Sequence, residues 1–325
     1  MATKLAWPDF FGKLRARLGL RRDSYLVSPG LYCVGQPDHQ SPVLVTANYK
    51  LTFDALRSQL GGLDAWILVL DTFGVNVWCA AGKKNFSTRE LVRRIELCGL
   101  SEIVSHRRLI LPQLGAPGVA AHQVKKESGF EVKWGPIRAA DLKKYLADGL
   151  QATPVMREVT FSLSERMVLV PVELTILLKP SFYVLALVLL LSGIGPDFFS
   201  VSRAWGRGSA AFGAYGLGVL AGAGLVPLLL PWIPGRQFFL KGIEMGVLVV
   251  TGAFLLWGKM IGSGLESLAL ISFVIAVSSY TAMNFTGATP FTSLSGVEKE
   301  MRQGLPVQIA ALVVAIVGWL ASPFF

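Results

Sequence analysis

Two patterns of hydrophobic and polar residues divide this chain. Before Arg166, short apolar runs alternate with amphipathic stretches, whereas after it long apolar stretches follow one another. Strand-like and helix-like segments in alternation predict an α/β domain with a mostly parallel sheet. Apolar stretches near 20 residues predict membrane-spanning helices. We therefore predict a basic, amphipathic N-terminal segment at 1–23, an α/β domain at 24–166 and an all-α transmembrane domain at 167–325.

The alternating elements of the first half can be placed one by one. Buried strands are typically short continuous apolar runs, and helices begin at capping residues and end at glycine. Gly61 and Gly129 are the predicted stops of two helices, and Ser87 with Glu90 forms the S-x-x-E pattern of a capping box. The predicted strands are 41–49, 64–71, 107–112 and 130–134, and the predicted helices are 51–60, 88–99, 118–129 and 138–149.

The second half contains about five predicted membrane spans. They are 176–195, 209–231, 240–258, 264–283 and 306–323. Lys179 and Pro180 interrupt the first span, and the segment 167–179 before it is interpreted as lying along the interface. Glu244 and Glu266 are expected to reach the interface from span ends. Small residues recur every four positions in the second span and predict close helix packing inside the bundle: Ala210, Ala214, Gly218 and Gly222.

Composition and charge agree with this division. The chain is 52% hydrophobic, with a mean hydropathy of +0.52, which is too apolar for one soluble domain. Residues 1–166 hold 23 of the 31 Lys and Arg and 15 of the 21 Asp and Glu. The basic excess favours anionic lipid of a bilayer or a charged partner, and no aromatic-and-basic module supports nucleic acid. Without a visible signal peptide, we expect a multi-pass protein of the cell (inner) membrane with its α/β domain in the cytoplasm.

The stretch "TFGVNVWCAAGKKNFSTREL", residues 72–91, places a cysteine between a strand and a helix. Its glycines and lysines do not have the spacing of a phosphate loop. A nucleophilic thiol would need a base such as His106 or His122, and nothing in the spacing pairs either with Cys79. Spacing alone favours a small buried cysteine, the interpretation also given to Cys33 and Cys98. These three cysteines form no CxxC pair, so neither a disulfide framework nor an iron–sulfur site is expected in this chain.

The octapeptide "NVWCAAGK", residues 76–83, resembles the cap-helix signature of the mercury-methylating corrinoid proteins, the HgcA family. The segments 43–54, 111–119 and 129–142 resemble the related corrinoid iron–sulfur proteins, as does the α/β domain followed by five spans. Those soluble relatives carry a cysteine-rich iron–sulfur module that is not found in this sequence.

The resemblance implies a Rossmann-like domain that binds cobalamin or a related corrinoid, with Cys79 as lower axial ligand to cobalt. A thiolate is a soft, strong donor, and coordination removes the thiol proton. The resemblance also implies a site built from the short helix around 76–82 and a neighbouring strand end: Asn76, Val77, Trp78, Ala80, Ala81, Gly82, Lys83, Thr46, Asn48, Tyr49 and Thr72. Asn76 is expected to cap the helix, the small residues to admit the macrocycle, and Lys83 to be a solvated charge.

The function that the resemblance implies is corrinoid-dependent methyl transfer to Hg(II), giving methylmercury in anaerobic one-carbon metabolism. Its expected partners are a small ferredoxin-like protein with [4Fe–4S] clusters and a folate-linked methyl donor. Two alternatives stay open. One is a membrane-anchored corrinoid methyl carrier with an acceptor other than mercury. The other is a corrinoid-binding or transport module without turnover, although a transporter has no need of an axial thiolate and its spans should line a polar path.

Overall fold

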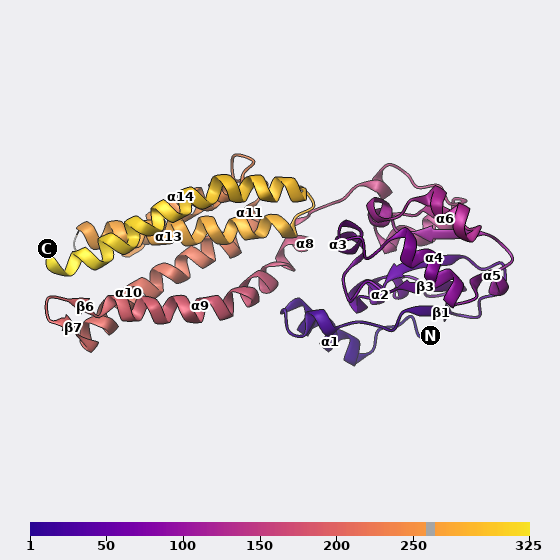
Figure 1. Ribbon diagram of the computed structural model, residues 1–325, viewed down its shortest axis with the longest axis horizontal. Coiled ribbons are helices and arrows are strands. Elements are labelled where there is room, and N and C mark those ends of the chain that lie inside the picture. Colours follow the sequence, from indigo (N-terminus) through magenta and orange to yellow (C-terminus); the bar gives the residue numbers. More distant parts are fainter. Residues whose placement is uncertain (258–263) are drawn as a thin grey trace. The chain divides into compact units, whose positions relative to one another are not determined.

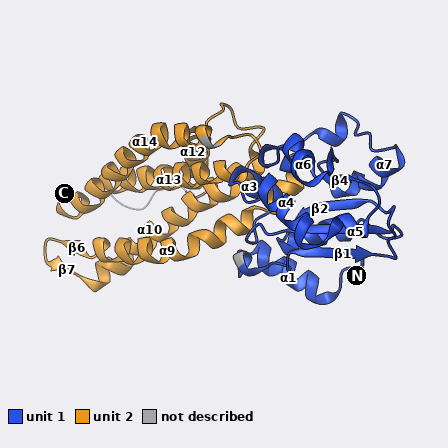
Figure 2. Ribbon diagram, turned by 45° about the vertical axis from the view of Figure 1, so that its right-hand side comes forward, with its two compact units in different colours: residues 1–160 blue, residues 161–325 orange. Residues whose placement is uncertain are grey.

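The computed structural model describes residues 1–257 and 264–325. It divides into two compact units, unit 1 at residues 1–160 and unit 2 at residues 161–325 (Figures 1 and 2). Unit 1 is built from strands and helices, whereas unit 2 is almost entirely helical. The change of element type therefore falls close to the change of hydrophobic pattern at Arg166.

A five-stranded sheet forms the centre of unit 1. Its order is β1-β3-β2-β4-β5. The strands are β1 (Gly30–Val34), β2 (Val43–Ala47), β3 (Ala65–Leu70), β4 (Arg108–Leu111) and β5 (Glu131–Trp134). Strands β2 to β5 pair in parallel, as predicted, and β1 pairs antiparallel with β3 at the edge. The sequence analysis missed β1, an edge strand in which only the last residue is buried.

Helices cover both faces of this sheet. They are α2 (Lys50–Arg57), α3 (Val77–Gly82), α4 (Thr88–Leu97), α5 (Leu100–Ile103), α6 (Ala121–Ser128) and α7 (Leu142–Ala147), with short 3-10 turns η1 (Arg22–Ser24), η2 (Gln113–Gly118), η3 (Ala139–Asp141) and η4 (Val155–Arg157). Val43 and Val45 pack with α3, α4 and α6, while Leu44 between them packs with α2 and α7. Alternation along a buried strand therefore produces an α/β/α domain with two cores.

The predicted capping box at α4 is only half formed. The hydroxyl of Ser87 accepts a hydrogen bond from the Glu90 N–H at 3.3 Å. The Glu90 carboxylate does not return to Ser87; it accepts from the Asp71 N–H at 3.0 Å and from Arg94. Burial raises the pKa of Glu90, but these hydrogen bonds outweigh it and hold the pKa below its usual range. Glu90 therefore fastens the end of β3 to α4.

The N-terminal segment contains helix α1 (Trp7–Arg17). Asp9 on α1 accepts hydrogen bonds from Lys50 and Arg57, both at 2.7 Å, and the same two cations bind Asp54. This network holds α1 against α2. The opposite side of the helix exposes Trp7, Phe10, Phe11 and Leu14, so α1 is amphipathic, as predicted.

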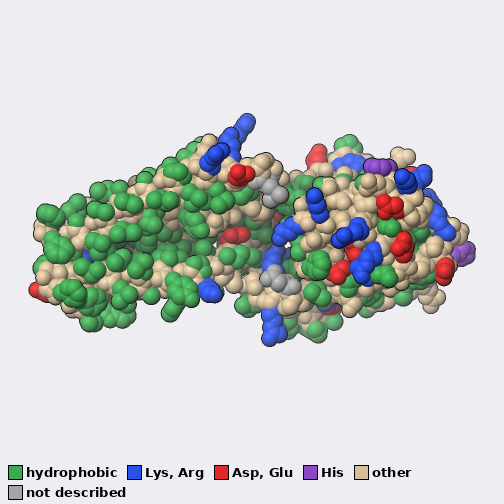
Figure 3. Space-filling model, in the orientation of Figure 1, with side chains coloured by type: hydrophobic (Ala, Val, Ile, Leu, Met, Phe, Trp, Pro, Cys, Tyr) green, Lys and Arg blue, Asp and Glu red, His purple; other side chains and the backbone are tan. Residues whose placement is uncertain are grey.

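Unit 2 consists of α8 (Leu163–Met167), α9 (Val170–Ser192), α10 (Val201–Val219), a π-helical turn η5 (Leu220–Leu225), α11 (Val226–Leu229), α12 (Phe238–Trp257), α13 (Gly264–Asn284), η6 (Phe285–Ala288), α14 (Leu294–Ala321) and η7 (Ser322–Phe324), with a small hairpin of β6 (Ile194–Gly195) and β7 (Phe198–Phe199). Five helical segments in the described part of the chain are long and apolar enough to cross a membrane. Hydrophobic side chains cover most of the visible face of unit 2, whereas charged side chains are spread over unit 1 (Figure 3).

Helix α9 differs from its prediction. It is a single helix that continues through Pro180 and includes residues 170–179, which were expected to form a separate interfacial segment. Its middle and its carboxyl end are tied to other helices, since Ser181 binds the Tyr215 hydroxyl at 2.6 Å and Ser192 accepts from Trp319 at 3.0 Å. Apolar helices tolerate proline when neighbouring groups support the backbone.

Small residues bring α10, η5 and α13 together. A Cβ at Gly218 would lie 2.8 Å from Val277, and a Cβ at Gly222 would lie 2.2 Å from the Ser278 carbonyl oxygen. The small-residue ladder therefore packs inside the unit, as predicted. The two glutamates are both partly buried, and their expected reach to the interface stays a prediction. Glu266 pairs with Arg207 at 2.9 Å, and Oε2 of Glu244 is buried.

Candidate functional site

The cysteine of the 72–91 stretch lies on α3, a helix of six residues. The side chain of Asn76 accepts a hydrogen bond from the Cys79 N–H at 2.8 Å, so the predicted cap is present. Helical periodicity then divides the residues between two sides. Val77, Ala80 and Ala81 are buried, whereas Trp78 and Cys79 are exposed. The thiol is therefore free and faces outward from a helix whose other side is fixed in the core.

The buried side of α3 packs against η2, the segment that follows β4. A Cβ at Gly118 would lie 2.0 Å from the Phe86 carbonyl oxygen and 3.0 Å from Cα of Ala81. A side chain at residue 118 would therefore displace the helix. Ala80 and Ala81 are almost completely buried in the core, so this contact with η2 explains their small size. Gly82 differs, because a Cβ there would meet nothing within 4 Å.

Asn48 builds the turn that leads into α3. Its side-chain oxygen accepts hydrogen bonds from the Thr72 N–H at 3.1 Å, the Thr72 hydroxyl at 2.9 Å and the Gly74 N–H at 3.0 Å. Its amide nitrogen donates to Asp71 at 3.2 Å. Asn48 is 2% exposed, so a single buried amide joins the end of β2 to the turn after β3. This places α3 at the carboxyl ends of the parallel strands.

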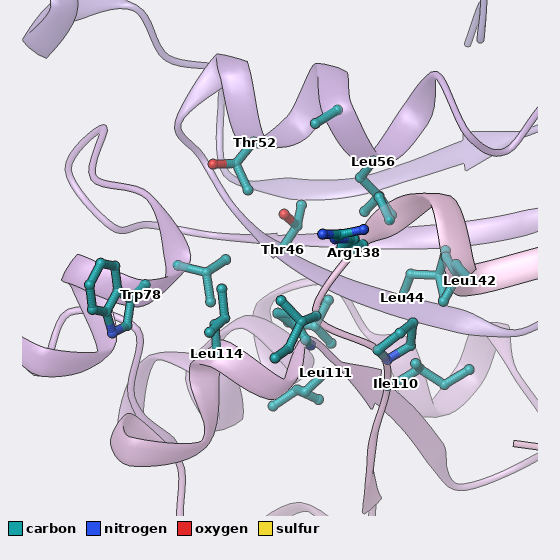
Figure 4. Close-up of a pocket in the computed structure, with 18 of the residues that line it drawn as sticks. Leu44, Thr46, Thr52, Leu56, Trp78, Ile110, Leu111, Leu114, Arg138 and Leu142 are labelled. Atoms are coloured by element: carbon teal, nitrogen blue, oxygen red, sulfur yellow. The ribbon is translucent and has the colours of Figure 1, made fainter. Parts of the chain in front are cut away.

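A cavity of about 350 Å³ lies at the same end of the sheet. Most of its lining is apolar, from β2, β4, α2 and the segment after β5. Its polar side chains are Thr46, Thr52, Asn76 and Arg138, and α3 contributes Val77 and, at one end, Trp78 (Figure 4). Ligands of open α/β sheets bind outside the carboxyl ends of the strands, and the volume lies within the range of about 300–1,000 Å³ typical of ligand sites.

The predicted site residues separate into three groups. Those that line the cavity are Thr46, Asn76, Val77 and Trp78; those exposed along α3 and its end are Cys79, Gly82 and Lys83; those in the interior, away from the cavity lining, are Asn48, Tyr49, Thr72, Ala80 and Ala81. Asn48 and Thr72 bind each other in the turn, and Tyr49 precedes α2 with Arg22 over its ring. The third group therefore positions the first two.

The other cysteines and His106 do not join this site. Cys33 was interpreted as buried, but it is exposed on the edge strand β1, so that prediction is wrong. Cys98 packs against the core, and burial raises its pKa. His106 lies before β4, at the opposite end of the strands from Cys79, and its Nε2 is 2.9 Å from the Ser41 carbonyl oxygen. No cluster of three or more metal-binding side chains exists among the described residues.

Arg138 is the polar cavity residue that the sequence analysis missed. It follows Gly135 and Pro136, directly after β5, and its guanidinium donates to the Thr160 hydroxyl. The available signal was its position, since it comes just beyond the carboxyl end of a predicted parallel strand.

Comparison with known proteins finds similarity in unit 1. Residues 21–146 match the family CdhD, described as the CO dehydrogenase/acetyl-CoA synthase delta subunit. The acetyl-CoA decarbonylase/synthase complex subunit gamma of Methanopyrus kandleri is 33% identical over 127 residues, and that of Methanocaldococcus jannaschii is 40% identical over 99 residues. These alignments cover 38% and 29% of this chain.

The similarity is confined to part of each relative. The alignments span 27% of the Methanopyrus kandleri subunit and 20% of the Methanocaldococcus jannaschii subunit. The chain thus shares about a quarter of the length of these relatives. The match includes the sheet, the cavity and α3, and it ends before unit 2 begins.

Proposed function

We propose that unit 1 binds a corrinoid and carries a methyl group on it, with the Cys79 thiolate as the lower ligand of cobalt. The observation that carries this proposal is the exposed thiol on α3, whose buried side is fixed against η2. The match over residues 21–146 and the resemblance to corrinoid iron–sulfur proteins support the same cofactor.

The residues present fit such a group. A soft sulfur donor stands at an open surface where a flat macrocycle can approach it, and Gly82 beside it has free space in place of a side chain. The adjoining cavity combines an apolar wall with Thr46, Thr52 and Arg138. Corrinoids carry amide and phosphate groups around an apolar ring, and hydroxyl and guanidinium groups bind these well.

The chain's own contribution to the reaction is to hold one sulfur atom in place. Asn48 fixes the turn, Asn76 fixes the first turn of α3, and Ala80 and Ala81 anchor the helix in the core. A bound corrinoid supplies a cobalt atom that accepts and releases a methyl group. Cys79 Sγ would hold the cobalt of such a group, and a soft, electron-donating sulfur would favour transfer of methyl as a carbanion equivalent. Trp78, which lines the cavity, would pack beside the ring of such a group.

We propose Hg(II) as the methyl acceptor, because a soft cation is a suitable partner for a carbanion-like methyl group. The resemblance of residues 76–83 to the mercury-methylating proteins supports this choice. A ferredoxin-like protein with [4Fe–4S] clusters would reduce the site, and a folate-linked donor would supply methyl. Unit 2 would anchor the protein in the cell membrane with unit 1 in the cytoplasm, and its five apolar helices support that placement.

The comparisons favour a second candidate, in which the same methyl carrier serves an acceptor other than mercury. The relatives are named as subunits of an acetyl-CoA decarbonylase/synthase complex. A place in a complex implies protein partners, and a methyl group passed to a partner protein would use the same Cys79. This candidate differs from mercury methylation only in the acceptor.

The test uses the full chain reconstituted with cobalamin in lipid nanodiscs. Cys79→Ala should change the cobalt absorption spectrum and lower methyl transfer to Hg(II) by about 100-fold or more, which corresponds to about 2.7 kcal/mol. Cys33→Ala is the matched control, because it removes another free and exposed thiol of unit 1. An unchanged spectrum in Cys79→Ala would overturn the ligand assignment. Methyl transfer to a protein partner but not to Hg(II) would favour the second candidate.

A further inference from the structure

Unit 2 contains a second cavity, larger than the one in unit 1. Its volume is about 570 Å³, and it lies between α9, α10, α13 and α14. The way in which α9 is spaced from the neighbouring helices explains this cavity. Among the described residues of α9 only Val172 and Ser192 are buried, so the helix borders the cavity without filling it. Contacts near Pro180 and at the carboxyl end hold α9 in this position.

The lining is apolar over most of its length. On α13 it extends from Ala269 to Asn284, a rise of about 22 Å at 1.5 Å per residue. Helix α14 runs antiparallel to α13 (Figure 1). Its residues Leu312, Ile316 and Trp319 line the cavity alongside those of α13. Shape and lining therefore match a long hydrocarbon chain rather than a compact molecule.

Polar residues gather at one end, where Tyr280, Thr281, Asn284 and Gln308 line the cavity. Gln308 is 6% exposed. The Ser279 hydroxyl donates to the Phe239 carbonyl oxygen at 3.0 Å, so it accepts the hydrogen bond from Gln308 Nε2, also at 3.0 Å. A hydroxyl has one proton to donate, which fixes the orientation of the Gln308 amide.

The remaining oxygen of this amide has no donor. Oε1 of Gln308 is buried and receives no hydrogen bond from any described residue. A buried carbonyl oxygen normally has a partner. The described lining residues include no Lys, Arg, His, Asp or Glu, so a charged head group would have no counter-ion at this end.

From these observations we propose that the unit 2 cavity binds an uncharged long-chain alcohol of the membrane, with its hydroxyl donating to Gln308 and its chain along α13 and α14. Acyl and isoprenoid chains share this chemistry. The inference rests on the placement of unit 2 in a bilayer and does not depend on the corrinoid or on mercury.

The experiment places the full chain in phosphatidylcholine nanodiscs with a hexadecanol probe that carries a diazirine in its chain. Irradiation should label the described cavity residues of α13 and α14, and unlabelled hexadecanol should compete. Diazirine-bearing palmitate, whose head is charged, should label about tenfold less. An isoprenoid alcohol probe in a parallel sample identifies which chain type is preferred.

Two matched variants test the position of the ligand. Leu312→Trp fills the cavity and should lower labelling about tenfold, whereas Val313→Trp, on the next residue of α14 but outside the lining, should not. Gln308→Leu should remove the preference for alcohol over palmitate. Labelling of wild type that unlabelled hexadecanol does not compete would overturn the proposal even if a variant fails to fold. Equal labelling of Leu312→Trp and Val313→Trp would also overturn it.

Discussion

Exposed hydrophobic side chains have opposite meanings in the two units. In unit 1 the central strand β2 is fully buried between helices, and exposed Phe73 and Trp78 lie on or beside α3 at the candidate site. In unit 2 exposed residues such as Leu255 and Leu256 are the rule, and together with helix length they favour a lipid environment. Exposed hydrophobic side chains therefore indicate a binding site in unit 1, whereas in unit 2 they favour lipid around the helices.

The two cavities differ in the same way. The unit 1 cavity contains Arg138 and two threonines, which suits a ligand with polar groups. The unit 2 cavity has no charged residue among its described lining and ends at an unsatisfied amide oxygen. Each cavity thus matches the ligand class that its surroundings would supply.

The largest effect is expected from a substitution at the closest helix contact of unit 2. Gly222→Leu would place a Cβ 2.1 Å from Thr281 Oγ1 and 2.2 Å from the Ser278 carbonyl oxygen. Overpacking of this kind costs about 1–3 kcal/mol, and more where backbone must move. We expect loss of the monodisperse peak of the full chain in detergent. Gly213→Leu, on α10 with nothing within 4 Å of its Cβ, is the control and should behave as wild type.

This pair also tests whether the units fold separately. If they do, the Cys79 thiol of Gly222→Leu should still react with a maleimide at the wild-type rate, because α3 is fixed by contacts within unit 1. A large change in that rate would show that the comparison of two independent units is wrong.

A smaller effect is expected in unit 1, where glycine supports a helix–turn contact. Gly118→Ala would press on Ala81 and the Phe86 carbonyl oxygen and should destabilise residues 1–160 by about 1–3 kcal/mol. Gly82→Ala is the matched control, because its Cβ has open space, and Ala favours a helix by about 1 kcal/mol over Gly. Chemical denaturation of the full chain, followed by the rate of Cys98 modification, measures both, because Cys98 packs against the core of unit 1 and Cys79 is already exposed in the folded state.

The Gly82→Ala control also tests the proposed cofactor contact. If a corrinoid uses the space at Gly82, this variant should bind cobalamin more weakly although it is at least as stable as wild type. Unchanged cobalamin affinity would place the macrocycle elsewhere on α3.

Most of the fold of unit 1 follows from local patterns. Three of the four parallel strands contain apolar runs, β5 alternates apolar and charged residues, and the capping residues and glycines that bound the helices act within a few residues. Strand β1 was not predicted, because an edge strand needs only one partner strand and only partial burial. The full length of helix α9 was not predicted, because proline normally ends helices in soluble proteins. Pro180 is tolerated inside this apolar helix.

Less of the candidate site than of the fold could be predicted from the sequence. Asn48 acts on residues 23 to 26 positions away, and no spacing rule connects a strand end to a turn at that distance. Cys79 could be placed on a short helix only by resemblance, because six residues are too few to show a helical period. The capping role of Asn76, which spans three residues, was correctly predicted.

The smallest effect concerns α1, which ion pairs hold to unit 1. Burial raises the pKa of Asp9, but hydrogen bonds from Lys50, Ala6 and Arg57 outweigh it and leave the pKa far below its usual value. Asp9 therefore binds its proton more weakly in the folded state than in the unfolded chain, where its pKa is about 3.9. The stabilisation is complete above that pH and is lost as the pH falls through and below it.

We expect hydrogen exchange of the α1 amides to be slow at pH 7 and to accelerate, after correction for intrinsic rates, only below about pH 4. Asp9→Asn should loosen α1 already at pH 7, by about 1 kcal/mol or less, because partly exposed ion pairs contribute little. Asp148→Asn, at an exposed carboxylate after α7, is the control. If α1 exchanges equally in wild type and Asp9→Asn at pH 7, its docking depends on apolar contacts, and the aromatic side of α1 rather than its ionic side holds the helix.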